Sequence, residues 1–209
     1  MLTITISRPL VWLWRFRHRR GYGVHSPFAF DFITNVVYEH APYYKYDELN
    51  EQVARQEAAL GHAWSHREPL RLKQLLFRMV NRAQPARIIH IGPPSAIGLY
   101  LQAGKQGAHY TEVYTPEDLQ LGTGTTVDFL YIDDTSHPAA AEAAFARCAA
   151  QAGPQSVFVL RGVGYTHGMR EAWKRLRQHP DAVVTFDLYD VGIVFFDPSK
   201  NRQHYVVNF

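Results

Sequence analysis

Short runs rich in β-branched residues alternate with helix-like segments after residue 85, and this alternation limits the fold more than any other feature. The first run, Ala86–Gly92, follows Pro85 and is typical of a strand buried on both faces of a parallel sheet. Further strands are predicted over residues 109–114, 127–132, 156–160, 183–188, 192–196 and 204–208, and helices over 96–103, 138–151 and 167–178. This alternation predicts an α/β fold with a mainly parallel sheet covered on both faces.

The last three predicted strands follow one another without a helix between them. We expect them to be antiparallel to one another, because a parallel return needs a long crossover. Before the first strand, the sequence predicts an irregular arm and three helices, over residues 27–40, 47–61 and 69–81. We therefore divide the chain into an N-terminal arm with helices, residues 1–85, and a core, residues 86–209, which together form one unit.

The composition is that of one globular domain of 209 residues, of which 46% are apolar and 20% charged. The single cysteine, Cys148, excludes an intrachain disulfide and a multi-cysteine zinc site, and it suits a reducing compartment such as the cytoplasm. No apolar run approaches the roughly 18 residues that a transmembrane helix needs. The apolar stretch Pro9–Trp14 is short and its basic residues follow it, which is not the pattern of a secretory signal.

Positive charge is concentrated in residues 1–20, which contain five arginines and no acidic residue. The net charge of the whole chain is +3, so the remainder carries −2. Trp12, Trp14 and Phe16 alternate with these arginines, a pattern that suits contact with nucleic acid or an anionic membrane. The alternative, which we favour, is an amphipathic arm that packs on its own domain or on the partner in a homodimer.

Ligands of an open α/β sheet bind beyond the carboxyl ends of the strands. The first predicted strand ends in Ile91–Gly98, where Gly92 can form a tight turn and Gly98 can let a helix pack closely. Pro93 and Pro94, however, lack the backbone N–H groups with which such a loop cradles a nucleotide. Taken alone, the segment is a weak indication of a ligand loop.

Two other predicted strands end in charged residues. Asp133 can face a ligand or can cap the helix that begins at Pro138, whereas Asp134 is expected to be solvated. Arg161 can hold a carboxylate or a phosphate, but we favour an internal ion pair with Asp133 or Asp134 on the neighbouring strand.

The histidines do not indicate a metal site. His62 and His66 are spaced i, i+4, but the glycine and proline around them do not favour a helix, and no third ligand is nearby. His25 is expected at a helix entry, beside Ser26 as the N-cap and Pro27 as the first helical residue.

Both ends of the chain and its middle resemble one family. Arg20–Asp31 resembles the N-terminal signature of a group of methyltransferase-like proteins of Bacteroidetes. Ile88–Gly98 looks like the first strand and glycine loop, and Phe129–Asp133 like the fourth strand, of class I, Rossmann-like small-molecule O-methyltransferases. The closing part of the family is similar to residues 168–173, 187–196 and 204–207. The resemblance implies a Rossmann-like sheet, S-adenosylmethionine as the cofactor and a small-molecule substrate.

The resemblance also implies which residues form the site. The implied cofactor contacts are Gly92, Ser95, Gly98, Glu117 and Asp133. The candidate catalytic base is Asp133 or His137. The implied substrate or lid residues are His25, Ser26 and Arg161.

The chain departs from the family pattern in the half that holds the cofactor. Tyr114 or Thr115 stands where the family has an acid for the ribose hydroxyls, with Glu117 as a displaced substitute. Arg161 stands where metal-dependent relatives have an acid. Only 34 residues lie between Gly92 and residue 127, room for one βαβ crossover of about 30 residues but not for the full fold. We therefore expect the sheet to be reduced at the edge formed by strands two and three of the family.

Three functions are consistent with these features. The chain can be a small-molecule methyltransferase, or a catalytically inactive protein of the same fold that binds a partner or another ligand. It can also be an adaptor that contacts nucleic acid or a membrane through residues 1–20. Similarity of fold alone does not decide among them.

Overall fold

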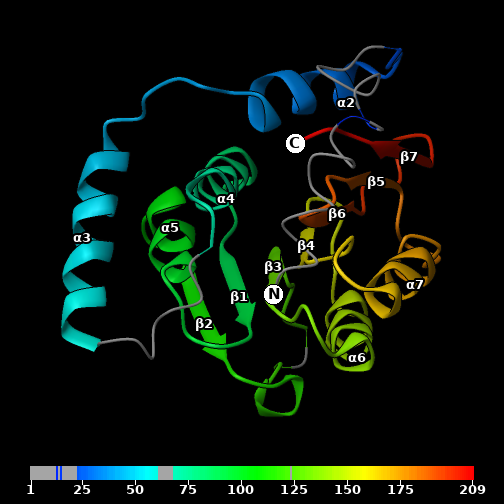
Figure 1. Cartoon of the computed structure of the whole chain (residues 1–209). Helices are drawn as coiled ribbons and strands as arrows, with labels where there is room; N and C mark the ends of the chain where they lie inside the picture. Colours follow the sequence, from blue (N-terminus) through cyan, green and yellow to red (C-terminus); the bar gives the residue numbers. More distant parts are fainter. Residues whose placement is uncertain (1–12, 14, 16–22, 61–67, 123) are drawn as a thin grey trace.

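The computed structural model describes residues 13, 15, 23–60, 68–122 and 124–209 and centres on one seven-stranded sheet (Figure 1). The strands are β1 (Arg87–Ile91), β2 (His109–Val113), β3 (Phe129–Ile132), β4 (Val157–Arg161), β5 (Val184–Asp187), β6 (Val191–Phe195) and β7 (Gln203–Val206). Their order across the sheet is β2-β1-β3-β4-β6-β5-β7. Every predicted strand forms close to its predicted bounds, and the expected mainly parallel α/β fold is confirmed.

Helices cover both faces of the sheet (Figure 1). The elements are α2 (Pro27–Phe32), the π-helix η2 (Ile33–Val37), α3 (Lys45–Leu60), α4 (Leu70–Ala83), α5 (Ile97–Gly104), the 3-10 helix η4 (Pro116–Asp118), α6 (Pro138–Ala149) and α7 (His167–Leu176). One apolar cluster packs α2, η2, α4 and α5 on the sheet, and a second packs α6 and α7 on the opposite face. Helix α3 forms an outer layer over α4 and α5. Among the described residues, no helix has the length and apolar character to cross a membrane.

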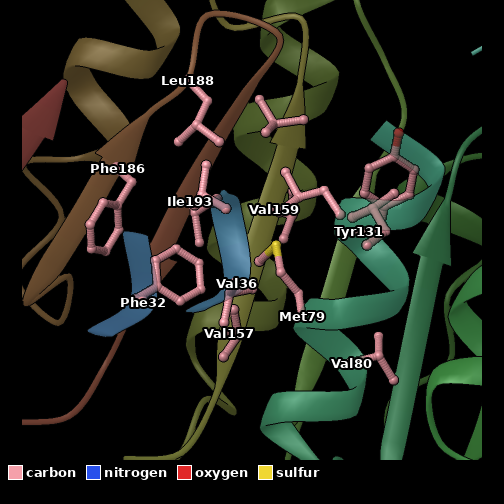
Figure 2. Packing of buried hydrophobic residues seen from close by; sticks show 14 of the residues in the cluster. Phe32, Val36, Met79, Val80, Tyr131, Val157, Val159, Phe186, Leu188 and Ile193 are labelled. Atoms are coloured by element: carbon pink, nitrogen blue, oxygen red, sulfur yellow. The ribbon is translucent and has the colours of Figure 1, made fainter. Parts of the chain in front are cut away.

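The first cluster joins the N-terminal helices to the core. Figure 2 shows Phe32 and Val36 packed near Val157 and Ile193 of the sheet, with Met79 of α4 beside them. Because these side chains are buried together, the N-terminal helices and the sheet share one hydrophobic core.

The C-terminal strands correct one expectation. Strand β6 is antiparallel to β4 and to β5, whereas β7 pairs with β5 in parallel. The predicted antiparallel arrangement is therefore right for β5 and β6 and wrong for β5 and β7. Strand β6 itself carries the chain back along the sheet, so β7 returns in the direction of β5 without a crossover helix.

The segment between β1 and β3 contains one crossover helix and one strand, as its length predicted. The described chain between β1 and β3 forms α5, β2 and η4, and β2 is the edge strand of the sheet. One crossover helix and one strand therefore account for this segment.

The helix predicted over residues 27–40 forms as two segments. Ser26 caps α2 as predicted, because its Oγ accepts from the N–H of Ala29 at 3.3 Å. The chain then widens into η2, whose last carbonyls, on Val36 and Val37, accept hydrogen bonds from Arg78 of α4. This tertiary contact ends the helix at residue 37, three residues before the predicted end.

Candidate functional site

A cavity of about 240 Å³ lies between the carboxyl ends of β1, β3 and β4 and the start of α6; we call it the switch-point cavity. The direction of the sheet order changes between β1 and β3, since β2 lies on one side and β3 and β4 on the other. Open α/β sheets bind ligands at such a switch point. The lining includes Gly92, Tyr114, Asp133, His137, Ala140 and Arg161.

Gly92 ends β1 where there is no room for a side chain. Its φ is 146°, and a Cβ atom built on it would lie 2.8 Å from both the Cβ and the backbone oxygen of Asp133. The N–H of Asp133 also donates to the carbonyl of Ile91 at 2.8 Å, which keeps the two strand ends together. The predicted tight turn therefore requires glycine because β1 and β3 approach so closely.

The start of the loop after β1 offers a ligand no backbone donors. The N–H of Gly92 donates to the carbonyl of Val113 at 2.9 Å, and Pro93 and Pro94 have no N–H. The loop therefore offers a ligand even fewer backbone donors than the two prolines alone imply, because the amide of Gly92 is also hydrogen-bonded.

Ser95 and Gly98 shape the start of α5 and do not line the switch-point cavity. Ser95 is buried and accepts from the N–H of Ile97 at 3.3 Å through its Oγ. A Cβ on Gly98 would lie 2.8 Å from Tyr110 Oη, so Gly98 lets α5 approach β2, as predicted. Among the described residues, the backbone N–H groups of Ser95 and Ala96 are the donors of this loop that no hydrogen bond engages.

A buried ionic cluster lies beside the switch-point cavity. Arg161 Nη1 is 2.7 Å from Asp133 Oδ1 and 3.2 Å from Glu68 Oε1, which confirms the favoured ion pair. The two acids are 5% and 4% exposed. Asp133 Oδ2 is buried and accepts no hydrogen bond from any described residue. Sequence reasoning missed Glu68, which joins the start of α4 to the sheet from a distant part of the chain.

The cluster holds two acids and one guanidinium, and burial raises the pKa of Glu68 despite the opposing effect of Arg161. The folded state therefore favours the protonated form of Glu68. This stabilisation is complete below the ordinary pKa of a glutamate and is lost as the pH rises through the raised pKa of the folded protein. Glu68→Gln keeps an acceptor for Arg161 and cannot ionise. We expect the stability of this variant relative to wild type to increase from about pH 4 to pH 8, measured by urea unfolding. A difference that is constant with pH would contradict the assignment.

His137 stands at the rim of the switch-point cavity, held by Asp134. Its Nδ1 lies 3.1 Å from Asp134 Oδ2, and its backbone N–H donates to Asp134 Oδ1 at 2.9 Å. Asp134 rather than Asp133 therefore holds the turn before α6, and it is partly buried. The His137 side chain is largely exposed, so its other ring nitrogen is accessible.

Tyr114 lines the switch-point cavity at the end of β2, and its side chain is 67% exposed. Thr115 caps η4 through hydrogen bonds with Asp118 at 3.2 and 2.8 Å. Glu117 is exposed on η4 and does not line the cavity. Tyr114, Thr115 and Glu117 were the candidates for the position where the family has an acid for the ribose hydroxyls. Of these three, only Tyr114 lines the switch-point cavity.

The acid that β2 does carry is directed elsewhere. Glu112 Oε1 is 3.0 Å from His90 Nδ1, and Tyr110 Oη is 2.9 Å from the same nitrogen. His90 is fully buried in β1. Glu112 thus belongs to a polar cluster between β1 and β2, a pairing that the strand register creates and that the linear sequence does not reveal.

His25 and Ser26 lie at the start of α2 and do not line the switch-point cavity. Arg15, in the basic arm, is buried and pairs with Asp187 at 2.9 Å, with its guanidinium over the ring of Tyr189. This residue packs on its own domain, as in the interpretation that we favoured for the arm. The other arginines of residues 1–20 lie outside the described residues, so contact with nucleic acid or a membrane stays a prediction.

Metal ligands do not gather in the part of the chain that the structure describes: no group of three or more His, Cys, Asp or Glu residues could hold an ion there. His62 and His66 lie outside the described residues.

The sequence matches no protein-family model and no curated protein. The structure is similar to an O-methyltransferase from Bacillus cereus solved in complex with S-adenosylhomocysteine, with a TM-score of 0.55 and 14% sequence identity, over 78% of this chain and 96% of that chain. It is also similar to a methyltransferase from Podospora anserina bound to S-adenosylhomocysteine, with a TM-score of 0.53 and 10% identity, over 82% of this chain and 96% of that chain.

These likenesses define the fold. The chain has the fold of class I, S-adenosylmethionine-dependent methyltransferases, with a mostly parallel sheet and an antiparallel strand near the C-terminus. At this level of identity the likeness extends to the fold and not to the activity.

Proposed function

We propose that the switch-point cavity binds S-adenosylmethionine and that the protein transfers its methyl group to a small molecule. The observation that carries the proposal is the position of the cavity, at the switch point of a class I methyltransferase fold. The two enzymes compared above were solved with S-adenosylhomocysteine, the product of that cofactor.

Two features of the cavity fit such a cofactor. Asp133 Oδ2 is a buried acceptor that no described residue satisfies, and a hydroxyl or ammonium group of a ligand would satisfy it. The exposed ring of Tyr114 offers a stacking surface for an adenine at the end of β2.

In the proposed methyl transfer, the cofactor and the protein have separate roles. When bound, S-adenosylmethionine supplies an electrophilic methyl group on sulfur. The protein contributes orientation of the acceptor and exclusion of water. His137 is the better candidate base, because Asp133 is engaged by Arg161 whereas the imidazole is exposed and oriented by Asp134.

A second candidate is a ligand-binding protein that has lost catalysis. The engaged amide of Gly92, the two prolines after it and the pairing of Asp133 with Arg161 all reduce the interactions open to the cofactor. The cavity of about 240 Å³ also lies below the 300–1,000 Å³ that is typical of sites for drug-sized ligands. These observations favour a smaller ligand at the same place.

Calorimetric titration with S-adenosylhomocysteine separates the two candidates. We expect the wild-type protein to bind it with a Kd below about 1 mM. Ala140→Phe, which fills the cavity from α6, should weaken binding by about tenfold or more, because the added ring occupies the ligand volume. Ala143→Phe places the same ring on the exposed side of α6 and should leave the Kd unchanged. Absence of binding at about 1 mM ligand would overturn the methyltransferase proposal and favour the second candidate.

A further inference from the structure

A second and larger cavity, of about 570 Å³, lies between α4, the chain from residue 37 to the first turns of α3, and the C-terminal Phe209; we call it the α4 cavity. It shares no lining residue with the switch-point cavity. Nothing in the proposed function uses it.

Arg71, Gln74 and Arg78 project into the α4 cavity from one face of α4. Their i, i+3, i+7 spacing places them on the same side of a helix. Arg71 is half-exposed and already paired, since its Nη2 is 2.6 Å from Asp190 Oδ2 and its guanidinium lies over the ring of Phe209. The cation in this cavity that can pair with an anionic ligand is therefore Arg78.

Arg78 is 7% exposed and has no carboxylate partner among the described residues. Its Nε donates to the carbonyl of Val36 at 2.8 Å, its Nη2 to that of Val37 at 3.3 Å and its Nη1 to Tyr46 Oη at 3.4 Å. A guanidinium has five N–H groups, so these contacts leave two unused. Arg15 and Arg161, two guanidiniums that are also largely buried, each have a carboxylate at 3 Å or less.

A buried cation without a counter-ion favours an anionic ligand. Helix-end carbonyls offset part of the charge of Arg78, but they do not provide the negative charge that balances Arg15 and Arg161. Gln74, half-buried beside Arg78 on the same face, adds an amide that can donate to a carboxylate oxygen.

The remaining lining residues narrow the ligand class. Aromatic side chains, including Tyr43 and Tyr46 with ring centroids 5.3 Å apart, form part of the wall and suit a planar body. Glu39 is half-buried and Asp47 and His40 are exposed at the cavity. The two acids oppose a second negative charge on the ligand. A single carboxylate on an aromatic ring therefore matches the lining better than a phosphate or a dicarboxylate.

We infer that the α4 cavity is a binding site for a small aromatic monocarboxylate, whose carboxylate pairs with Arg78 and whose ring lies against the tyrosines. The ligand would connect α4, the turn before α3 and the chain end. This inference does not depend on binding of S-adenosylmethionine.

The test is the thermal unfolding of the full chain with benzoate as the probe, at constant ionic strength. At a benzoate concentration about ten times Kd, we expect the Tm to rise by about 3–5 °C, because the ligand binds the folded state alone. Benzamide, which lacks the charge, and isophthalate, which has two charges, should give a smaller shift. Equal shifts for benzoate and benzamide, or none for either, would overturn the inference.

Two charge variants on α4 test whether the rise in Tm with benzoate comes from binding in the α4 cavity. Gln74→Glu places a negative charge beside Arg78 and should abolish the benzoate shift without removing the hydrogen bonds that Arg78 makes. Asn81→Glu adds the same charge on an exposed position of α4 outside the cavity and should keep the full shift. A benzoate shift that survives Gln74→Glu would contradict the assignment of the site, whatever the outcome of titration with S-adenosylhomocysteine.

Discussion

Arg161→Met is expected to lower the free energy of unfolding by about 3–5 kcal/mol, because it leaves two acids buried without their cation. Asp133 and Glu68 both contact the same guanidinium nitrogen, and both acids are buried. Methionine has a similar length, so the cost comes from the uncompensated carboxylates more than from lost volume. Urea unfolding at neutral pH measures it.

The matched control for this variant is Arg175→Met. Arg175 also pairs with an acid, Glu142, but on the exposed surface of α6 and α7. Its loss should cost much less than that of Arg161, since solvent screens exposed pairs. Equal costs for the two variants would show that the buried cluster does not hold the N-terminal helices on the sheet.

Gly92→Ala is the second large effect and should destabilise the protein by about 3–5 kcal/mol. Alanine would have to adopt a φ of 146° and would place its Cβ 2.8 Å from the backbone oxygen of Asp133. Because that oxygen belongs to the end of β3, relief requires the two strand ends to separate. The same separation would deform the switch-point cavity, so binding of S-adenosylhomocysteine should weaken as well.

Gly107→Ala is the control for backbone strain alone. Gly107 has a φ of 80°, and a Cβ on it would meet no atom within 4 Å. Its substitution should cost about 1 kcal/mol, from the left-handed conformation alone. If Gly92→Ala costs no more than Gly107→Ala, the close approach of β1 and β3 does not limit this position.

The elements of the core could be predicted from the sequence because local patterns determine them. Strand β1 is bounded by a proline and a glycine, and α6 begins at a proline, so residues near these ends indicate where the elements start or stop. The ion pair of Arg161 with Asp133 was also predictable, since both residues end neighbouring parallel strands. The presence of a single strand between β1 and β3 followed from the length of that segment.

The remaining features depend on contacts between distant segments. Glu68 reaches Arg161 across 93 positions, and Arg78 ends η2 from 42 positions away, which no local pattern indicates. Glu112 and Tyr110 turn toward His90 because of the register between β1 and β2. The parallel pairing of β7 was missed for a similar reason, since β6 serves as the return.

The central claim is that the switch-point cavity holds the adenosyl cofactor, and amide chemical-shift mapping with S-adenosylhomocysteine tests it most directly. Two-dimensional ¹H–¹⁵N spectra report where the ligand binds as well as whether it binds. We expect the shifts to concentrate on the amides of Gly92, Tyr114 and residues 133–137, which line the cavity. Spectra that do not change, or changes confined to the lining of the α4 cavity, would contradict the claim.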